Sequence, residues 1–95
     1  MIDDKMKEKE KEFEKQLKAV ANRRRLAILK YLKKNNEAPV TEIANAIDLS
    51  FKATSKHLGI LAVLDIVQKE QRSLQVFYRL VGVYPPAITA IIKLL

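Results

Sequence analysis

The chain has 95 residues, of which 48% are hydrophobic, so it is long enough for one compact domain and too short for two. It contains no cysteine, which excludes disulfide bonds and metal sites built on thiolates. Its formal net charge is +7, and no stretch approaches the roughly 20 apolar residues that a membrane-spanning helix needs. No apolar run near the N-terminus resembles a signal peptide, so a cytoplasmic protein is expected.

The positive charge is unevenly distributed along the chain. Residues 1–18 carry as many acids as lysines, whereas residues 19–95 carry the whole excess of +7. A globular segment with this bias is suited to a polyanion such as nucleic acid, because attraction to phosphate supplies most non-specific affinity. A basic protein can also be basic only for solubility, so the sequence pattern has to decide between the two readings.

Two helices are predicted in the first third of the chain, after residues 1–7, which are expected to be disordered. Over residues 8–21, apolar side chains recur at intervals of three and four and form one stripe between charged faces. Asn22 is a good N-cap for a second helix over residues 23–34, because its side-chain oxygen can accept hydrogen bonds from the first free backbone N–H groups. Residues 35–39 contain two asparagines and a proline and predict a loop.

Two further helices joined by a tight connection are predicted next. Thr41 is expected to cap a short helix, and Ser50 is expected to cap a longer one over residues 51–64. Asp65 stands where the helix stop favours a left-handed backbone, which aspartate tolerates better than most residues. The inward face of the longer helix is predicted to consist of Thr54, Leu58 and Leu61.

The chain then changes from helical to strand periodicity. Residues 66–69 and 74–80 are rich in β-forming side chains around a polar tip, residues 70–73, and so predict a hairpin. A last helix is predicted over residues 87–95, with proline at its entry. This order of elements predicts a mainly α fold with a small β-hairpin wing, a winged helix-turn-helix, as a single domain over residues 1–95.

Four segments identify the fold more narrowly. They are Ala21-Asn22-Arg23-Arg24-Arg25-Leu26-Ala27-Ile28-Leu29, Val40-Thr41-Glu42-Ile43-Ala44, Leu49-Ser50 with Ser55-Lys56-His57-Leu58 and Leu61, and Val76-Phe77-Tyr78-Arg79-Leu80. In this order and spacing, over roughly residues 17–80, they resemble the ArsR-type (arsenic-repressor) winged helix-turn-helix transcriptional regulators. The resemblance implies a regulator that binds duplex DNA and pairs with a second copy of itself.

The chain departs from the family pattern at several positions. Arg23 replaces the usual proline, Asp65 the helix-end glycine, and Ser73 and Leu74 the wing-tip glycine and arginine, while the recognition helix opens with Phe51-Lys52 instead of Gln and Ser. These changes leave the fold prediction intact but put an inherited operator sequence in doubt. The thiolates of the family's metal sensors are absent and the last helix has no Asp, His and Glu set for zinc, so no metal and no cofactor is expected.

The resemblance makes residues 51–64 the recognition helix, whose outer N-terminal face would meet base edges in a major groove. Lysine can bind guanine acceptors, and a phenyl ring can pack against a thymine methyl group. A solvated helix with an exposed aromatic is the alternative, and for His57 a half-buried structural role is nearly as well supported. The DNA-binding residues expected on this helix are Ser50, Phe51, Lys52, Ser55, Lys56 and His57.

Further contacts with the DNA backbone are expected from arginines and from the wing. Arg23, Arg24 and Arg25 occupy a helix N-terminus, where the macrodipole disfavours cations, and this suggests another use such as binding phosphate. We assign that use to Arg23 and Arg24, and a structural role to Arg25, for which Glu42 is the candidate ion-pair partner. In the wing, Lys69 and Arg72, with Arg79 as a third candidate, are expected to flank the minor groove, and Arg72 is the strongest candidate.

The two terminal helices predict a homodimer. The last helix is apolar on more than one face, and a domain this small can bury only one face internally. The resemblance implies dimerisation through the first and last helices; packing within one chain is the alternative. The expected interface residues are Phe13, Leu17, Ile88, Ile91, Ile92 and Leu95.

The sequence therefore predicts a homodimeric, sequence-specific DNA-binding regulator, a repressor, that does not sense metal. Its partners would be double-stranded DNA and a second copy of the chain. A winged helix that binds protein instead of DNA is the alternative, favoured by Phe51 and the altered wing. An enzyme is not expected, because the sequence offers no nucleophile–base pair, phosphate loop or metal ligands.

Overall fold

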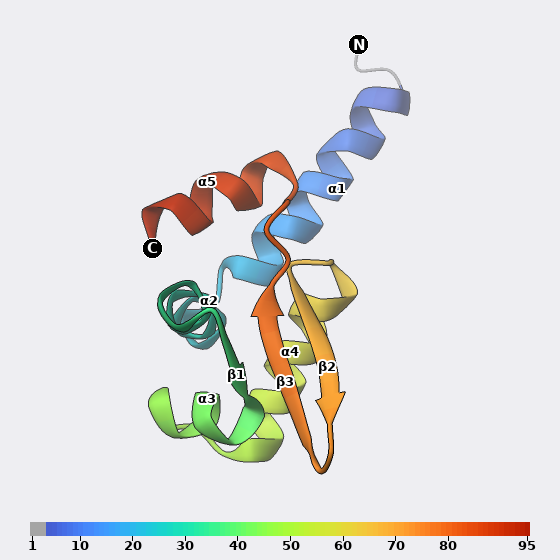
Figure 1. The fold of residues 1–95 in the computed structure, drawn as a ribbon. Coiled ribbons are helices and arrows are strands. Elements are labelled where there is room, and N and C mark those ends of the chain that lie inside the picture. Colours follow the sequence, from blue (N-terminus) through green and yellow to red (C-terminus); the bar gives the residue numbers. More distant parts are fainter. Residues whose placement is uncertain (1–3) are drawn as a thin grey trace.

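The computed structural model describes residues 4–95 and shows five helices and a three-stranded sheet (Figure 1). The helices and the antiparallel hairpin follow one another in the order predicted for a winged helix-turn-helix, so the predicted fold class is confirmed. The elements are α1 (Asp4–Val20), α2 (Arg23–Asn35), β1 (Glu37–Pro39), α3 (Val40–Ala46), α4 (Phe51–Val63), β2 (Val67–Arg72), β3 (Gln75–Leu80) and α5 (Pro86–Leu94).

Most helix boundaries agree with the prediction, and two differ. α1 begins at Asp4, inside the stretch that was expected to be disordered; residues 1–3 lie outside the described part of the chain. α3 begins at Val40 with Pro39 in the cap position, so Thr41 lies within the helix and does not cap it. Proline fits this position because its fixed φ suits the extended backbone that precedes a helix.

The sheet contains a strand that the sequence pattern does not reveal. β1 lies within the predicted loop and pairs antiparallel with β3, with Ala38 opposite Tyr78. β3 is thus the central strand, between β1 and β2. With only three residues, β1 is too short to show alternation, and its pairing depends on β3, which follows much later in the chain.

The core lies between the helices and the sheet. All five helices and all three strands contribute to it, and Thr54, Leu58 and Leu61 are completely buried, as predicted for the inner face of α4. The buried apolar residues are Ala19, Val20, Ile28, Leu29, Leu32, Ala38, Val40, Ile43, Ala44, Leu58, Leu61, Ile66, Val67, Tyr78, Ile88 and Ile92.

Four turns use a residue other than glycine in the left-handed region. Asn36, Asp48, Asp65 and Ser73 have φ values of 66°, 55°, 56° and 56°. Asparagine and aspartate tolerate this backbone because their short side chains can bond locally, so three of the four positions fit their residue type. The predicted left-handed helix stop at Asp65 is confirmed.

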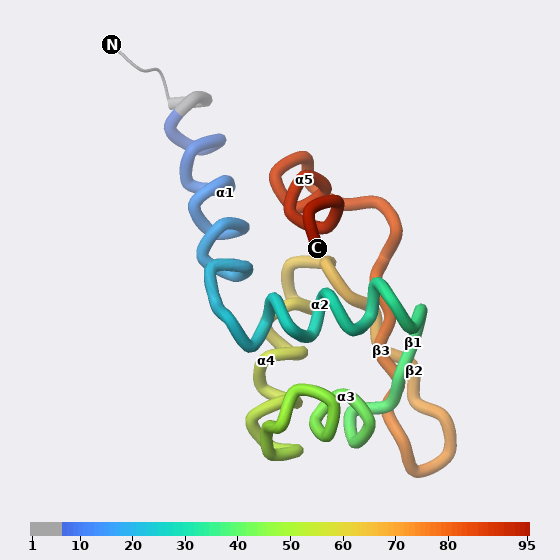
Figure 2. Tube along the Cα trace, turned by 90° about the vertical axis from the view of Figure 1, so that its left-hand side faces the viewer, coloured from blue at the N-terminus to red at the C-terminus, as the bar shows by residue number. Residues whose placement is uncertain are grey.

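The two terminal helices lie together at one end of the molecule, away from the hairpin tip (Figure 1). The N-terminal turns of α1 project beyond the body of the domain (Figure 2). α5 is held by Lys33 of α2, whose Nζ donates hydrogen bonds to the carbonyl oxygens of Ile92 and Leu95 at 2.9 and 2.8 Å. A cation at the carbonyl end of a helix is favourable because it complements the helix dipole. None of the described helices combines the length and the apolar character that a membrane span requires.

Candidate nucleic-acid interface

The helix-turn-helix is formed by α3, a short turn and α4. The left-handed Asp48 reverses the chain, and the Leu49 backbone N–H donates to the Ala44 carbonyl oxygen at 3.0 Å. Ser50 then begins α4, and its Oγ accepts a hydrogen bond from the Ala53 backbone N–H at 3.1 Å, so the predicted cap is confirmed. These local bonds fix the start of α4 at the same end of the molecule as the hairpin tip (Figure 1).

The N-terminal half of α4 presents a polar and aromatic face to solvent. Lys52 and Lys56, four residues apart, are both exposed, and the Phe51 ring is 57% exposed at the first position of the helix. Ser55 is half-buried between them. Because the opposite face is completely buried, the helix cannot rotate about its axis, and this outer face is the one available to a ligand.

His57 lies at the edge of this face and is half-buried. Its Nδ1 atom is inaccessible to solvent and has no hydrogen-bond partner within the described residues. Burial, and then the positive charges of Arg25, Lys56 and Arg24, lower the pKa of the imidazole below its ordinary value. The ring is therefore neutral at pH 7.

The three consecutive arginines at the start of α2 have different environments. Arg23 is exposed, whereas Nη1 of Arg24 donates to the Ile47 carbonyl oxygen at 3.3 Å and so ties α2 to the turn before α4. Nε of Arg25 is buried, with no hydrogen-bond partner in the described part of the chain.

The predicted ion pair between Arg25 and Glu42 is wrong. The Glu42 carboxylate instead accepts a hydrogen bond from the Tyr31 hydroxyl at 2.8 Å. This bond raises the pKa of the tyrosine.

The wing is a regular hairpin with an apolar end. Val67 pairs with Leu80 and Arg72 with Gln75, so the first strand extends three residues further than predicted, the second begins one residue later, and only Ser73 and Leu74 connect them. Leu74 is 96% exposed. The two aromatic residues of β3 lie on opposite faces, since Tyr78 is buried and Phe77 is only partly covered.

The cations of the wing lie on opposite faces of the sheet. Side chains alternate along a strand, so Lys69 shares the inner face with Val67, whereas Arg72 shares the outer face with Gln68 and Glu70. Lys69 is exposed. Arg79 of β3 donates from Nη2 to Oε1 of Gln68 at 3.1 Å, at the end of the hairpin far from the tip.

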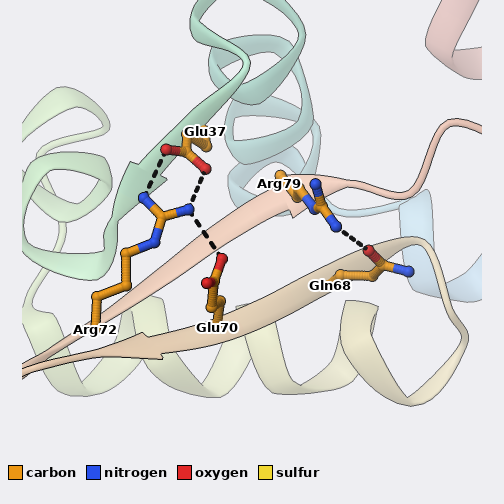
Figure 3. Close-up of polar contacts among 5 residues, drawn as sticks. All are labelled: Glu37, Gln68, Glu70, Arg72 and Arg79. Carbon is orange, nitrogen blue, oxygen red and sulfur yellow. Dashed lines mark hydrogen bonds and ion pairs between the residues drawn. The ribbon is translucent and has the colours of Figure 1, made fainter.

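Arg72 is engaged within the chain by two carboxylates. Its Nη1 and Nη2 donate to the two carboxylate oxygens of Glu37 at 2.7 and 2.8 Å, and Nη2 also donates to Glu70 at 2.9 Å (Figure 3). The guanidinium lies 4.4 Å from the centre of the Phe77 ring. These bonds raise the pKa of Arg72 and lower that of the Glu37 carboxyl. We call Glu37, Glu70 and Arg72 the wing triad.

The two acids of the wing triad were not among the predicted site residues. Glu70 and Arg72 have opposite charges two apart in a strand, a spacing that places both on one face, so this pair was within reach of the sequence. The contact between Glu37 and Arg72 could not be predicted from the sequence, because the position of Glu37 beside the hairpin depends on the unpredicted strand β1.

The residues predicted for a dimer interface divide into two groups. Ile88 and Ile92 are 0% and 7% exposed, so they are buried in the chain's own core. Leu17 is 48% exposed, and Phe13, Ile91 and Leu95 are half-buried. On α1, Phe13 and Leu17 line an open apolar depression of about 370 Å³ rimmed by Glu10, Glu14 and Lys18.

No group of three or more His, Asp or Glu side chains that could hold a metal ion is present in the part of the chain that the structure describes.

Comparison with known proteins identifies the family. Residues 22–69, from the cap of α2 into β2, match the family of bacterial regulatory proteins described as the arsR family. The transcriptional activator HlyU of Vibrio cholerae is 42% identical over 64 residues. The aligned segment covers 67% of this chain and 58% of HlyU, so it spans less than two thirds of that relative's length.

Solved structures agree with this assignment over nearly the whole chain. Reduced HlyU from Vibrio cholerae superposes with a TM-score of 0.78 at 34% identity, covering 95% of this chain and 90% of HlyU. NolR from Sinorhizobium fredii gives a TM-score of 0.85 at 26% identity, covering 99% and 90%. The homodimeric winged helix-turn-helix DNA-binding domain of Mb0332 from Mycobacterium bovis gives 0.77 at 26% identity, covering 98% and 80%. This chain belongs to the arsR family of bacterial regulatory proteins and is a winged helix-turn-helix transcriptional regulator, not an enzyme.

Proposed function

We propose that the chain is a homodimeric repressor that binds duplex DNA sequence-specifically and does not sense metal. The observation that carries the proposal is the outer face of α4, where Phe51, Lys52 and Lys56 are exposed while the opposite face is fully buried. A major groove admits one α-helix, and residues near the start of such a helix contact base edges. The net charge of +7 favours binding to phosphate.

Each residue of this face has a role that its chemistry supports. Lys52 and Lys56 bind guanine acceptors or phosphates, and Phe51 packs against a thymine methyl group. Ser50 and Ser55 donate or accept hydrogen bonds at the groove edge. His57, neutral and half-buried, orients the helix more than it binds DNA.

Contacts with the DNA backbone come from the two flanks of α4. Arg23 is exposed at the start of α2, and Arg24 is anchored to the turn before α4, so both approach the phosphates beside the recognition helix. Lys69 contributes from the inner face of the wing. Because such contacts are electrostatic, they make binding strongly dependent on salt.

The dimer forms through the surface that α1 and α5 leave uncovered. The apolar depression at Phe13 and Leu17 supports this, as do the half-buried Ile91 and Leu95. Ile88 and Ile92 are left out of the proposed interface because they are already buried within one chain. The relative Mb0332, described as homodimeric, supports the formation of a dimer. Two recognition helices about 34–36 Å apart would require a palindromic operator.

Repression needs nothing beyond the surfaces already described, because a protein that occupies an operator overlapping a promoter blocks polymerase. The proposal that the chain does not sense metal is supported by the lack of cysteine, which excludes thiolate ligands, and by the lack of a His, Asp and Glu cluster among the described side chains, residues 7–95. A reporter gene placed behind the selected operator would give the sign of regulation. Higher expression in the presence of the protein would contradict repression.

The first prediction tests DNA binding by charge reversal. Duplexes selected from a random pool should bind the wild type, with affinity falling steeply as salt rises. In the K52E/K56E variant the affinity should drop by at least about 100-fold, because two attractive charges become repulsive beside the phosphates. Fluorescence anisotropy in a salt series measures both quantities.

A matched control is available on the projecting part of α1. The K7E/K11E variant makes the same change in net charge at two exposed lysines of α1, and it should bind nearly as the wild type does at protein concentrations at which sedimentation shows both proteins to be dimeric. Equal losses in the two variants would indicate only a general effect of net charge. A wild type without affinity for any duplex at low salt would contradict the proposed function.

The second candidate function is recognition of a protein by the same end of the molecule. Phe51 and Leu74 are both exposed there, and they line a small depression of about 80 Å³ with Val40. Exposed apolar side chains near each other are typical of protein-binding surfaces. The K52E/K56E variant discriminates between the two candidate functions. If the surface binds protein instead of DNA, this variant should show no loss of a DNA-dependent phenotype.

A further inference from the structure

The wing has little free positive charge on its outer face. In regulators that bind DNA, a cation near the tip of a hairpin is the expected contact with the minor groove or its phosphates. Here Arg72 is the last residue of β2, directly before the tip, and it already makes three hydrogen bonds to carboxylates. The wing triad as a whole carries a formal charge of −1.

The direction of the Arg72 side chain is as informative as its partners. It extends across the outer face toward Glu37 of β1 and Glu70 of β2 (Figure 3). The Phe77 ring packs against the guanidinium and supports this orientation. Planar guanidinium groups bind carboxylates and phosphates in the same two-pronged geometry, so Glu37 occupies the positions that a phosphate would take.

We infer that Glu37 and Glu70 withhold Arg72 from DNA, and that these two acids thereby set how much the wing contributes to binding. The inference rests on the proposed function, since it concerns the strength of DNA binding. Glu37 is a positioning residue that acts through Arg72. The wing then approaches DNA with its neutral tip, Ser73 and Leu74, and the charge that binds phosphate lies on α4, on α2 and at Lys69 on the inner face of the wing.

The contacts of the triad can be exchanged. All three side chains are partly open to water, at 40% for Arg72, 40% for Glu37 and 61% for Glu70. Exposed ion pairs are weak because water and salt screen them, so removing one acid is enough to shift Arg72 toward a nearby phosphate. Releasing one cation to one phosphate steepens the dependence of log affinity on log salt by about 0.9.

The test is a cycle of four proteins: wild type, E37Q, R72Q and E37Q/R72Q. E37Q removes one negative charge with Arg72 present, and the step from R72Q to E37Q/R72Q removes the same charge with Arg72 absent. The second step therefore measures the pure effect of charge. The double variant also has the same net charge as the wild type, which makes those two directly comparable. Affinity for one selected duplex is measured over a salt series.

We expect E37Q to bind severalfold, up to about tenfold, more tightly than the wild type, with a salt slope steeper by about 0.9. The corresponding step in the R72Q background should give a smaller gain and no such change in slope. The double variant should match the wild type. R72K, which keeps the charge but loses the two-pronged geometry, should bind more tightly than the wild type, whereas a purely structural role predicts no gain.

The outcomes separate the inference from the function on which it rests. A double variant with a salt slope flatter than the wild type by about 0.9 would show that Arg72 already binds phosphate, and would overturn the inference. Equal gains from E37Q in the two backgrounds would overturn it as well, while leaving DNA binding intact. A wild type that binds no duplex overturns the proposed function and the inference with it. Thermal denaturation of all variants checks that the hairpin remains folded.

Discussion

Among the side chains of this domain, His57 is the one whose ordinary pKa lies closest to neutral pH. It is the only histidine of the chain, and burial followed by three neighbouring cations lowers the pKa of its imidazole. Between the ordinary pKa and this lowered pKa, the unfolded chain binds a proton that the folded protein does not bind. Acidification in this range therefore favours unfolding.

The free energy of unfolding should accordingly be at its full value above a pH of about 6.5 and fall as the pH drops through the folded-state pKa of His57. Replacing His57 with glutamine, which cannot take up a proton, should remove most of the stability loss that sets in as the pH falls below about 6.5. Urea denaturation at several pH values measures this. If wild type and H57Q lose stability equally, the loss arises from other groups.

Single residues also mark where reasoning from sequence reaches its limit. Residue type and spacing were enough to predict Asn22 and Ser50 as caps and Asp65 as a left-handed stop. They were not enough to predict that Arg72 is paired with carboxylates, because a cation next to a hairpin tip has the same sequence signature whether it is free or paired. Its partner Glu37 is 35 positions away, and only the tertiary fold brings the two together.

At the scale of elements, the five helices and the hairpin were predictable and the three-residue strand β1 was not. α2 and α4 each repeat their apolar side chains over several turns, so their positions followed from periodicity. β1 is formed because β3 supplies its hydrogen-bond partners, and nothing local distinguishes it from a loop. The start of α3 was predicted at the wrong residue because proline and threonine both suit a helix entry, and Pro39 rather than Thr41 takes that position.

The cap of α2 offers a prediction at this scale. The Asn22 side chain accepts hydrogen bonds from the backbone N–H groups of Arg24 and Arg25 at 2.9 and 3.1 Å. Asn22→Ala should lower the free energy of unfolding by about 1 kcal/mol, because both N–H groups lose their acceptor. Asn22→Asp keeps the acceptor and adds a negative charge at the positive end of the helix, so it should be at least as stable as the wild type.

Denaturant unfolding of the two variants provides the measurement, and the aspartate variant serves as the control. If both variants lose the same stability, the side-chain geometry of asparagine matters and its role as an acceptor does not. If neither loses stability, water replaces the cap.

At the scale of the whole molecule, the end proposed to face DNA and the terminal helices are opposite ends of one domain (Figure 1). α2 passes between them: its first turn is tied through Arg24 to the turn before α4, and Lys33 near its end holds α5. α2 is therefore bonded both to the turn before α4 and to the last turn of α5.

The contact between Lys33 and α5 can be tested by itself. Lys33→Met retains the aliphatic part of the side chain but removes the donors to the α5 carbonyl oxygens. Backbone amides of α5 should then exchange hydrogen faster, by a factor corresponding to about 0.3–1 kcal/mol, while those of α4 keep their protection. Exchange followed by mass spectrometry resolves the two helices. Unchanged exchange in α5 would mean that its buried isoleucines alone hold it in place.

The projecting part of α1 has a consequence for how the regulator responds to its own abundance. The side chains from Lys7 to Glu12 are all exposed, so these turns bury little apolar surface within one chain. Helices of this length are marginal in water unless something packs against them. Under the proposed pairing, ordering of these turns and assembly of the dimer are one coupled event, and the fraction of paired protein rises with concentration. Occupancy of an operator would then increase more steeply than in proportion to the amount of protein in the cell.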